Sequence, residues 1–342
     1  MNKIIALLLS LILLFTLAAC AKDKDNNSTN ISADNSGADD AVTVNIGSLK
    51  GPTTMGIVNL MKSAENGKFV DKYNFTMATD ASEIVAGVVS GDIDIALIPA
   101  NLAAVLYNKK TDKGITVIDI NTLGVLYCVT GDDSIKSIDD LAGKTVIMTG
   151  QGTTPEYSLR YLLEASGVKN CTLEFKSEAT EVAAVLANDP TQIAVLPQPF
   201  ATVAQVQNDA LHEAFSLSDE WDKVSDDSML VTGVTVVRNE FLEANSDAVT
   251  RFLTAHQESV KQATGDIEGT AKLVAEYGII EKAPIAQKAL PKCGIAFVVN
   301  DEMKSALEGY LQVLFNADPS SVGGTMPDEK FYMTTYKYGE AK

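Results

Sequence analysis

The feature that most constrains the fold is a pattern of residues that occurs twice along the chain. The segment Asp80–Ile84 has a counterpart of the same character 98 positions later, at Glu178–Val182. At the same offset, the apolar run Ile95–Pro99 has its counterpart at Ile193–Pro197. In both copies the first segment predicts the start of a helix, and the apolar run predicts a buried strand. The chain is therefore predicted to contain two homologous lobes rich in βαβ units.

The repeat extends upstream to a glycine-rich turn in each copy. A strand pattern over residues 42–46 leads to a Thr-Thr pair at 53–54, which opens a helical pattern. A second strand pattern, residues 145–148, leads to Thr-Thr-Pro at 153–155, which opens another. Proline suits the first turn of a helix because its missing N–H has no partner there. Each copy is predicted to run strand, turn, helix, strand, capped helix, buried strand, proline, helix.

Capping residues indicate where several helices begin. Asp80 or Ser82 is predicted to cap the helix of the first copy, and Ser177 or Thr180 that of the second. Ser246 is predicted to cap a later helix. Further helical patterns lie near residues 267–277, 283–290 and 301–316.

Two more strand patterns, Leu123–Thr130 and Met229–Val237, follow the first and the second copy. If both cross between the lobes, lobe 1 is discontinuous, with residues 41–125 and 236–342, and lobe 2 comprises residues 126–235. We therefore predict an α/β fold with two lobes joined by two hinge strands. Its ligand cleft is expected beyond the carboxyl ends of the strands.

The N-terminus has the pattern of a secretion signal that ends at a cysteine. Lys3 precedes an almost wholly apolar stretch, Ile4–Leu17, and small residues stand just before Cys20. This stretch is too short for a membrane span and predicts a signal peptide over residues 1–19. Cys20 resembles the cysteine of the bacterial lipobox, which receives a diacylglycerol, and two acyl chains suffice for stable anchoring. The alternative is a plain secretory signal in which Cys20 is incidental.

Residues 20–40 predict a lipidated, flexible tether, because Ile31 is their only large apolar side chain. We therefore expect the protein on the extracytoplasmic face of the cell membrane, held by its lipid. The chain has 27 basic and 45 acidic residues and a formal net charge of −18. This charge argues against a nucleic-acid partner and against broad contact with anionic lipid.

The cysteines give little sign of chemistry. Besides Cys20, the chain has Cys128, Cys171 and Cys293, each next to apolar residues. They allow at most one intramolecular disulfide and are interpreted as small buried apolar side chains. No Cys or His spacing suggests a metal site, and no cofactor is expected.

The two glycine-rich turns supply the first candidate ligand-binding residues. Unpaired backbone N–H groups and hydroxyls at a helix N-terminus attract anions or polar oxygens. The candidates from these turns are Thr53, Thr54, Gln151, Thr153 and Thr154. The alternative is that these threonines only cap their own helices.

The loops after the two repeated strands supply the second set of candidates. Asn101 and Gln198 are expected to exchange hydrogen bonds with a ligand, and Phe200 to supply an apolar wall. The alternative for them is helix capping and turn formation. Asn121, Thr122 and Met229 on the connecting strands are further candidates.

The positions of the charged residues narrow the chemical class of the ligand. The three arginines, none of them on a predicted cleft loop, are Arg160, Arg238 and Arg251. Proteins commonly bind a carboxylate ligand through two N–H donors of an arginine guanidinium, so an amino acid is disfavoured as the ligand. Glu156, Glu178 and Glu181 lie near the second turn, where two of them are expected to stabilise helix N-termini. If one faces the cleft instead, it favours an amine or a heterocyclic N–H, as in an aminosulfonate or an aminopyrimidine.

An enzyme is the rival class of function. A hydrolytic triad needs a histidine, and His212 and His256 lie in polar-flanked patterns that predict solvent exposure. No GxSxG or HExxH motif is present, so we do not expect catalysis. Trp221 stands among acidic residues and is interpreted as part of a solvated helix surface.

Four phrases carry a family resemblance: Leu49–Gly56, Ile98–Asn108, Thr122–Tyr127 and Leu196–Phe200. They resemble lipid-anchored substrate-binding proteins of ABC importers, nearest to the nitrate, sulfonate and taurine group, which shares a fold with binders of thiamine pyrimidine precursors. The resemblance covers nearly all of the chain after the tether. It implies a type II periplasmic-binding-protein fold that captures a small polar solute between its lobes. It also implies an ABC permease and ATPase as partners. We expect the protein to be a monomer. A ligand sensor or a surface lipoprotein with the same cleft is the alternative.

Overall fold

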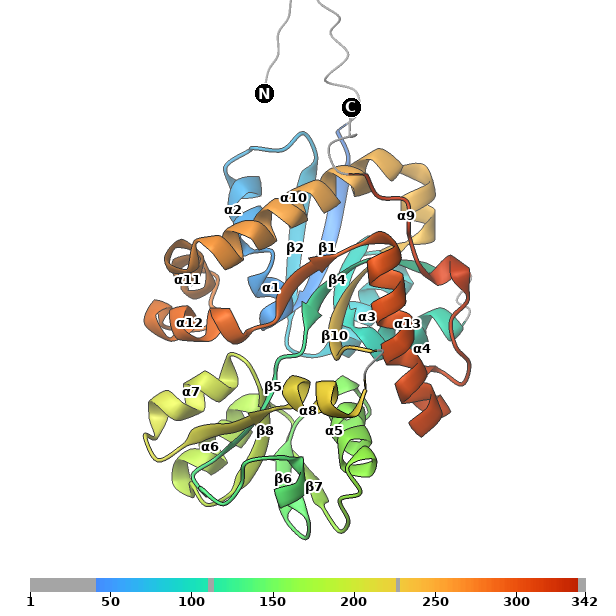
Figure 1. Ribbon diagram of the computed structural model, residues 1–342. Helices are drawn as coiled ribbons and strands as arrows, with labels where there is room; N and C mark the ends of the chain where they lie inside the picture. Colours follow the sequence, from blue (N-terminus) through green and yellow to red (C-terminus); the bar gives the residue numbers. More distant parts are fainter. Residues whose placement is uncertain (1–40, 110–113, 226–227, 338–342) are drawn as a thin grey trace, which may run out of the picture. The chain divides into compact units, whose positions relative to one another are not determined.

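The computed structural model describes residues 41–109, 114–225 and 228–337 (Figure 1). These residues belong to one compact unit, Asp40–Lys342. The predicted signal peptide, Cys20 and the predicted tether, residues 20–40, lie outside the described residues. Within the described ranges, no helix combines the length and the apolar character needed to cross a membrane.

The first sheet has six strands in the order β11-β4-β10-β3-β1-β2. Their bounds are β1 Thr43–Leu49, β2 Lys72–Ala78, β3 Ile95–Pro99, β4 Ile115–Leu123, β10 Val231–Arg238 and β11 Ile295–Val298. Strand β1 pairs in parallel with both β2 and β3, whereas β10 runs antiparallel to β3 and β4.

The second sheet has five strands in the order β7-β6-β8-β5-β9. Their bounds are β5 Leu126–Thr130, β6 Thr145–Met148, β7 Thr172–Phe175, β8 Ile193–Pro197 and β9 His212–Ser216. Strand β6 pairs in parallel with β7 and β8, and β5 runs antiparallel to β8. The arrangement of β6, β7 and β8 therefore repeats that of β1, β2 and β3, which confirms the predicted α/β fold.

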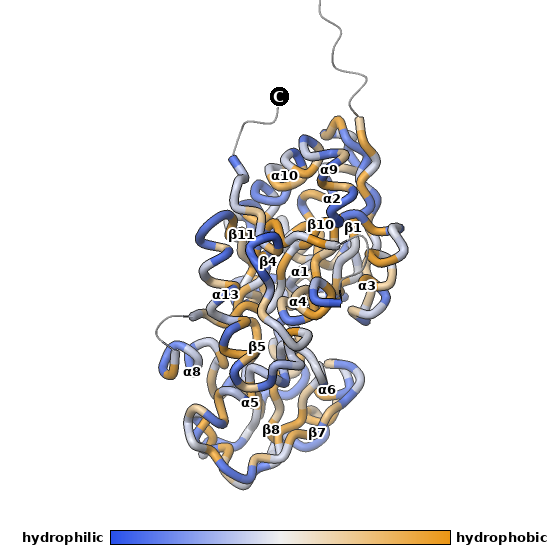
Figure 2. Tube along the Cα trace, turned by 90° about the vertical axis from the view of Figure 1, so that its right-hand side faces the viewer, coloured by the Kyte–Doolittle hydropathy of each residue, from blue (hydrophilic) through white to orange (hydrophobic). Residues whose placement is uncertain are grey.

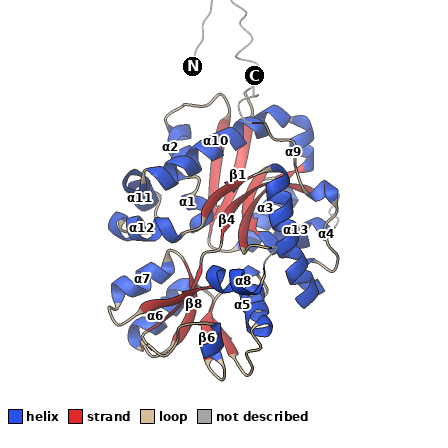
Figure 3. Cartoon of the chain, in the orientation of Figure 1, coloured by secondary structure: helices blue, strands red, loops and turns tan. Residues whose placement is uncertain are grey.

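Helices pack on both faces of the first sheet (Figure 3). The α-helices are α1 Pro52–Met55, α2 Val58–Glu65, α3 Ala81–Ser90, α4 Ala100–Asn108, α5 Thr154–Ala165, α6 Ala179–Asn188, α7 Phe200–Gln207, α8 Leu217–Val224, α9 Asn239–Ala244, α10 Ser246–Gly265, α11 Ile267–Glu276, α12 Ala283–Ala289 and α13 Asn300–Ala317. Short 3-10 helices span Ile138–Leu141, Leu290–Lys292, Pro319–Val322 and Glu329–Phe331.

The two repeated strands are apolar at successive positions because both of their faces are covered. In β3, Ile95 and Leu97 belong to the core cluster under α2 and α10, while Ala96 and Ile98 belong to the cluster under α3, α4 and α13. Strand β8 alternates in the same way between the clusters under α5 and α6. Polar and apolar segments alternate along helix α10 (Figure 2), whose apolar face is buried.

The predicted helix starts are confirmed in part. Asp80 caps α3, since its carboxylate accepts a hydrogen bond from the Ser82 backbone N–H at 2.7 Å. The patterns predicted at 267–277, 283–290 and 301–316 correspond to α11, α12 and α13. The single helix predicted after Thr53 is instead two short helices, α1 and α2, which are separated at Gly56 and Ile57.

Three predicted caps are wrong. Neither Ser177 nor Thr180 caps α6, because the Glu181 carboxylate accepts the Ser177 backbone N–H at 3.1 Å and the Thr180 hydroxyl donates to Glu178. Glu181 thus ties the residue that precedes the cap to the first turn of α6, while the N-cap residue, Glu178, makes no side-chain cap. Ser246 is the first residue of α10 and makes no side-chain cap.

The segment predicted as one strand, residues 123–130, is two strands in different sheets. Strand β4 ends at Leu123 and β5 begins at Leu126. The predicted lobe boundary at 235/236 would divide β10, all of which lies in the six-stranded sheet. We therefore propose that lobe 2 ends before Val231; the division into lobes stays a prediction.

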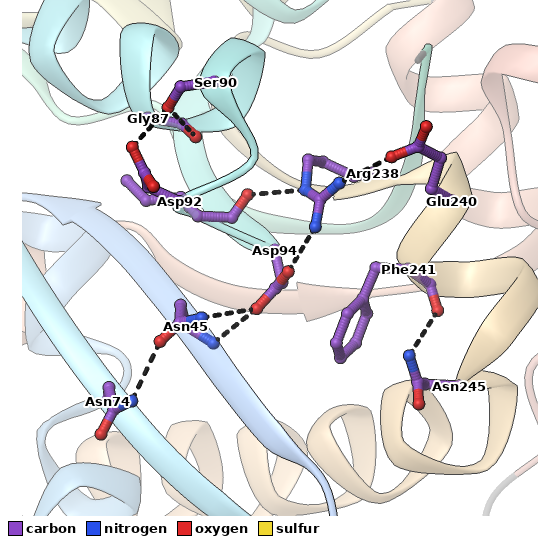
Figure 4. A network of polar contacts seen from close by, with 11 residues as sticks. Asn45, Asn74, Gly87, Ser90, Asp92, Asp94, Arg238, Glu240, Phe241 and Asn245 are labelled. Atoms are coloured by element: carbon purple, nitrogen blue, oxygen red, sulfur yellow. Dashed lines mark hydrogen bonds and ion pairs between the residues drawn. The ribbon is translucent and has the colours of Figure 1, made fainter.

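A network of polar contacts ties together the ends of β1, β3 and β10 (Figure 4). Buried Asp94 accepts hydrogen bonds from the backbone and the side-chain amide of Asn45, at 2.9 and 3.0 Å. Its other oxygen forms an ion pair with Arg238 at 2.6 Å, and Arg238 Nε donates to the Ile93 carbonyl. Because Asn45 lies near the start of β1 and Asp94 just before β3, this network occupies the edge opposite the carboxyl ends of β1 and β3.

The prediction that Trp221 lies on a solvated surface is wrong. Its side chain is fully buried, with its ring centroid 4.6 Å from that of Tyr161 in α5 and 5.4 Å from that of Tyr310 in α13. The indole N–H donates to the Ser228 hydroxyl at 3.0 Å. Trp221 follows Leu217 by four positions, so the two share one buried face of α8 while the exposed acidic residues lie on the other.

Candidate functional site

A cavity of about 140 Å³ lies where strands of both sheets end. Leu49, Pro99 and Pro197 bring the carboxyl ends of β1, β3 and β8 to its wall. Thr122 of β4 and the first residues of β10 complete the wall, together with the turn before α1. The cavity therefore has the position that α/β sheets give to their ligand sites.

The repeat brings equivalent residues to this cavity. Pro99 and Pro197 each close a repeated strand, and both contribute to the wall. Proline fixes its own backbone angle and donates no N–H, so the wall at these positions needs little reorganisation when a ligand enters.

The first predicted turn contributes Thr53 to the cavity wall. The Thr53 hydroxyl donates to the Leu49 carbonyl at 2.8 Å. Thr54 is fully buried and its hydroxyl lies 2.6 Å from the same carbonyl and 2.7 Å from the Ser48 hydroxyl. Helix α1 has only four residues, so its dipole is small.

The donors of the second predicted turn have partners within the chain. The backbone N–H of Gly152 donates to the Glu156 carboxylate at 2.7 Å, as expected for a glutamate that stabilises a helix N-terminus. The Thr153 hydroxyl donates to the Gly150 carbonyl. Gln151 is exposed.

Asn101 and Thr154 contact each other. The Asn101 side-chain oxygen accepts the backbone N–H and the hydroxyl of Thr154, at 3.1 and 3.2 Å. The Asn101 amide donates to the Ser321 carbonyl at 3.2 Å. Asn101 thus joins α4, the N-terminus of α5 and the 3-10 helix Pro319–Val322.

Gln198 and Phe200 lie at the start of α7, away from the cavity wall. Gln198 is fully buried; its amide donates to Glu213 at 2.8 Å and its oxygen accepts the Thr202 hydroxyl at 2.8 Å. Phe200 packs against the core cluster under α6 and α7. Among the predicted binding residues, all of which the structure describes, Thr53 and the further candidate Thr122 contribute to the cavity wall. A binding role stays a prediction for all of them.

The prediction that His256 is exposed is wrong. His256 is fully buried, 5.6 Å from the Phe252 ring and 5.5 Å from the Phe297 ring between centroids. Its Nδ1 lies 3.1 Å from Asp119, which is also fully buried. The polar residues that follow His256 differ in exposure, since Gln257 is half-buried, Glu258 is exposed and Ser259 is buried. They do not reveal the partner of His256 on β4.

Comparison with known families supplies the observation that decides the identity. Residues 61–268 match the family model described as NMT1/THI5 like. The chain belongs to the NMT1/THI5-like family. No curated protein matches it by sequence.

Solved structures that are similar to this NMT1/THI5-like chain include an ABC transporter protein from Parabacteroides distasonis. It is 23% identical, with 85% of this chain and 98% of that chain covered and a TM-score of 0.71. The periplasmic aliphatic sulphonate binding protein SsuA from Escherichia coli is 14% identical, with 87% and 94% covered and a TM-score of 0.68. The periplasmic nitrate-binding protein NrtA from Synechocystis PCC 6803 is 13% identical, with 82% and 84% covered and a TM-score of 0.61. The predicted periplasmic-binding-protein fold and the family resemblance are confirmed.

Sequence reasoning missed part of the cavity wall of the NMT1/THI5-like chain. The Thr232 hydroxyl lines the cavity, is buried and has no hydrogen-bond partner in the part of the chain that the structure describes. Gly233 follows it, and an added Cβ there would lie 2.7 Å from Asn121 Oδ1 and 3.2 Å from Thr53 Cγ2. A lone glycine inside a strand pattern signals a close approach of this kind and could have found the site.

A second cavity of about 420 Å³ in the NMT1/THI5-like chain lies between α7 and α12. Lysines 288 and 292 contribute to its wall, with Thr202, Gln205 and Val206 opposite. The Lys292 ammonium pairs with Glu213 at 2.6 Å. This cavity is bounded by helices, not by strand ends. In the described ranges, no group of His, Cys, Asp or Glu residues could hold a metal ion.

Proposed function

We propose that this protein is the extracytoplasmic solute-binding subunit of an ABC importer, which captures a small polar solute and delivers it to a permease and its ATPase. The cavity at the carboxyl ends of strands from both sheets carries this proposal. It is supported by the structural likeness to proteins whose names describe sulphonate and nitrate binding. A binding role without catalysis is part of the proposal, because no His, Cys, Asp or Glu lies among the described residues of the cavity wall.

The cavity volume limits the size of the solute. About 140 Å³ is close to the roughly 150 Å³ of an engineered cavity that binds benzene. We therefore propose a solute of about six non-hydrogen atoms. Thr53, Thr122 and Thr232 are proposed to contact its polar groups, and Pro99 and Pro197 its apolar surface.

We also propose that Cys20 carries the lipid anchor, that residues 20–40 form the tether and that the protein acts as a monomer. The lipobox-like sequence before Cys20 supports the anchor. Mass spectrometry of the protein from a membrane fraction should show a diacylglycerol on Cys20, and Cys20→Ser should release the protein from the membrane. A Cys20→Ser variant that stays membrane-bound would contradict the anchor and leave the binding proposal standing.

Native mass spectrometry of the gently purified full chain tests the binding proposal. We expect a co-purified or added small solute to bind the wild-type protein. Thr232→Phe, which places a ring in the 140 Å³ cavity, should abolish binding. The matched control Val206→Phe, at the wall of the other cavity, should retain it. Loss of binding with Val206→Phe alone would move the site to the α7–α12 cavity.

A further inference from the structure

A buried chain of side-chain hydrogen bonds runs from the core to the cavity wall. It begins at the His256–Asp119 contact and continues from Asp119 to Thr235 at 2.8 Å and from Thr235 to Asn121 at 3.1 Å. It ends with the Thr122 hydroxyl, 2.8 Å from Asn121 Oδ1. All five residues are buried, and Thr122 belongs to the cavity wall.

A β-bulge explains how neighbouring residues of one strand can both join this chain. Gly233 of β10 pairs with Thr122, and the next residue, Val234, pairs with Ile120, so Asn121 is an extra residue in β4. Successive side chains of a regular strand point to opposite faces, whereas a bulge re-aims them. The bulge therefore lets the Thr122 hydroxyl reach the side chain of Asn121.

The Asp119 carboxylate, at the inner end of this chain of hydrogen bonds, fixes the direction of each hydrogen bond from Thr235 to Thr122. A carboxylate accepts hydrogen bonds and cannot donate them, so the Thr235 hydroxyl donates its hydrogen to Asp119. Thr235 must then accept from the Asn121 amide nitrogen, which orients the amide. The Asn121 oxygen consequently accepts the hydrogen of the Thr122 hydroxyl.

The Thr53 hydroxyl also donates its hydrogen within the protein, for an independent reason. Its hydroxyl donates to the Leu49 carbonyl at 2.8 Å, and a carbonyl can only accept. Two threonines of the cavity wall, from different elements, have therefore already donated their hydrogens within the protein. Toward a ligand, both hydroxyl oxygens can therefore only accept hydrogen bonds, through their lone pairs.

We propose that Asp119, through this chain of hydrogen bonds, makes Thr122 a hydrogen-bond acceptor at the cavity wall, beside Thr53, which the Leu49 carbonyl holds in the same role, so that the solute presents N–H or O–H donors to these two oxygens. This inference rests on the proposed function and narrows its solute class. An oxyanion without a donor leaves these two oxygens facing its own oxygens, so that within the described wall its side-chain donors are limited to Lys50 and Thr232. Asp119 is a positioning residue, because it acts through Thr235 and Asn121 and does not line the cavity.

Calorimetry with matched probes tests the inference. Taurine has an ammonium donor that ethanesulfonate lacks, and 4-aminopyrimidine has an amino donor that pyrimidine lacks. Nitrate serves as an anion that can only accept hydrogen bonds. We expect wild-type protein to prefer the donor-bearing member of a pair by at least roughly tenfold, because an unpaired buried acceptor is costly.

Asp119→Asn is the decisive variant. An asparagine amide can donate to Thr235, which allows the whole chain to reverse and the Thr122 hydroxyl to donate into the cavity. The preference for donor-bearing probes should therefore fall severalfold or invert. A merely structural role would weaken both members of a pair equally, and an unchanged ratio would overturn the proposal.

Thr122→Val provides a second route if Asp119→Asn fails to fold. It removes the acceptor at the wall, so the preference should shrink. Thr116→Val is the matched control in the same strand, because the Thr116 hydroxyl bonds to Asn239 and lies away from the cavity; it should keep the wild-type ratio.

The identity of any solute held by the purified protein separates the two proposals. A bound solute that lacks N–H and O–H groups, or equal binding of nitrate and the donor-bearing probes, would overturn the polarity inference and leave solute binding intact. If no solute is held and no probe binds, the proposed function itself fails, and this inference fails with it.

Discussion

Gly233 shows how one missing side chain shapes the cavity at the residue scale. A Cβ at this position would lie 2.7 Å from Asn121 Oδ1, which belongs to the hydrogen-bond chain from Asp119 to Thr122, and would crowd Thr53. Contacts this short cannot be accommodated without displacing a neighbour.

We expect Gly233→Ala to lower the free energy of unfolding by about 1–3 kcal/mol, the typical cost of overpacking, and to weaken solute binding. Urea unfolding and calorimetry measure the two effects. Gly265→Ala is the control, because an added Cβ there meets nothing within 4 Å and alanine favours a helix by about 0.5–1 kcal/mol. Equal stability of the two variants would contradict the close approach.

Arg238 and Arg160 stabilise the protein to different degrees. Arg238 is largely buried with Asp94, whereas Arg160, which pairs with Glu156, has a side chain that is 54% exposed. Removing one partner of a buried pair leaves an uncompensated charge, while exposed pairs contribute little.

Arg238→Ala should therefore lower the free energy of unfolding by about 3–5 kcal/mol. Arg160→Ala should change it by less than about 1 kcal/mol. Urea titrations followed by circular dichroism distinguish these outcomes. If both substitutions have the same small effect, the network at the ends of β1, β3 and β10 does not contribute as we describe.

At the scale of elements, helix α13 packs against α5 and α8 through Tyr310. Burial raises the pKa of the Tyr310 hydroxyl to about 12, with hydrogen bonds to Ser158 and Thr154 opposing the shift. The unfolded tyrosine has an ordinary pKa of about 10. Between these values the folded protein retains a proton that the unfolded chain loses, so the contribution of Tyr310 to stability is complete below about pH 10 and falls as pH rises toward 12.

Tyr310→Phe should make the loss of stability between about pH 10 and 12 less steep. Urea midpoints measured at several pH values across this window test the prediction. Burial also raises the pKa of Tyr127 to about 12, so some slope should persist in the variant. An identical slope in wild type and variant would remove Tyr310 from the explanation.

Local pattern predicted elements well where both faces of a segment are buried. The strands Ile95–Pro99, Ile193–Pro197 and Thr145–Met148 have their predicted limits, because continuous apolar runs end sharply at proline or glycine. Pattern failed for α8, where Trp221 is buried by helices distant in sequence. It also failed at residues 123–130, where a short connection separates two sheets without a change in composition.

At the scale of the whole described unit, two kinds of contact join the sheets. Near α13, one continuous apolar cluster contains residues of both sheets, and Asn101 bonds to Thr154. Near α7 and α12, Val203 of α7 packs against the cluster that contains Ala286 and Ala289 of α12, and the polar Lys292–Glu213 pair lies beside the larger cavity. We infer that the α13 side stays closed more firmly than the α7 side.

Asn101→Ala should lower the free energy of unfolding by about 1–3 kcal/mol, because it leaves the Thr154 N–H and hydroxyl buried without an acceptor. Lys292→Ala removes a partly exposed pair and should cost less than about 1 kcal/mol. Thermal unfolding of both variants measures the difference. A larger loss for Lys292→Ala would reverse our assignment of the firm side.

The family and the fold could be predicted from the sequence, but most of the binding site could not. The sequence predicts Asn101 and Gln198 as polar side chains that follow buried strands, and the structure places them there. Their partners, Ser321 and Glu213, are far away in the sequence or on another element, and no local pattern reveals them. The cavity wall instead depends on Thr232 and Gly233, whose importance follows from packing between strands.

The buried position of Trp221 has a practical consequence. The chain has no other tryptophan, so its intrinsic fluorescence arises from a single indole that contacts Tyr161 and Tyr310. Any rearrangement that separates α8 from α13 would change the emission of this one fluorophore. The protein thus contains a label-free optical probe of the junction between its two sheets.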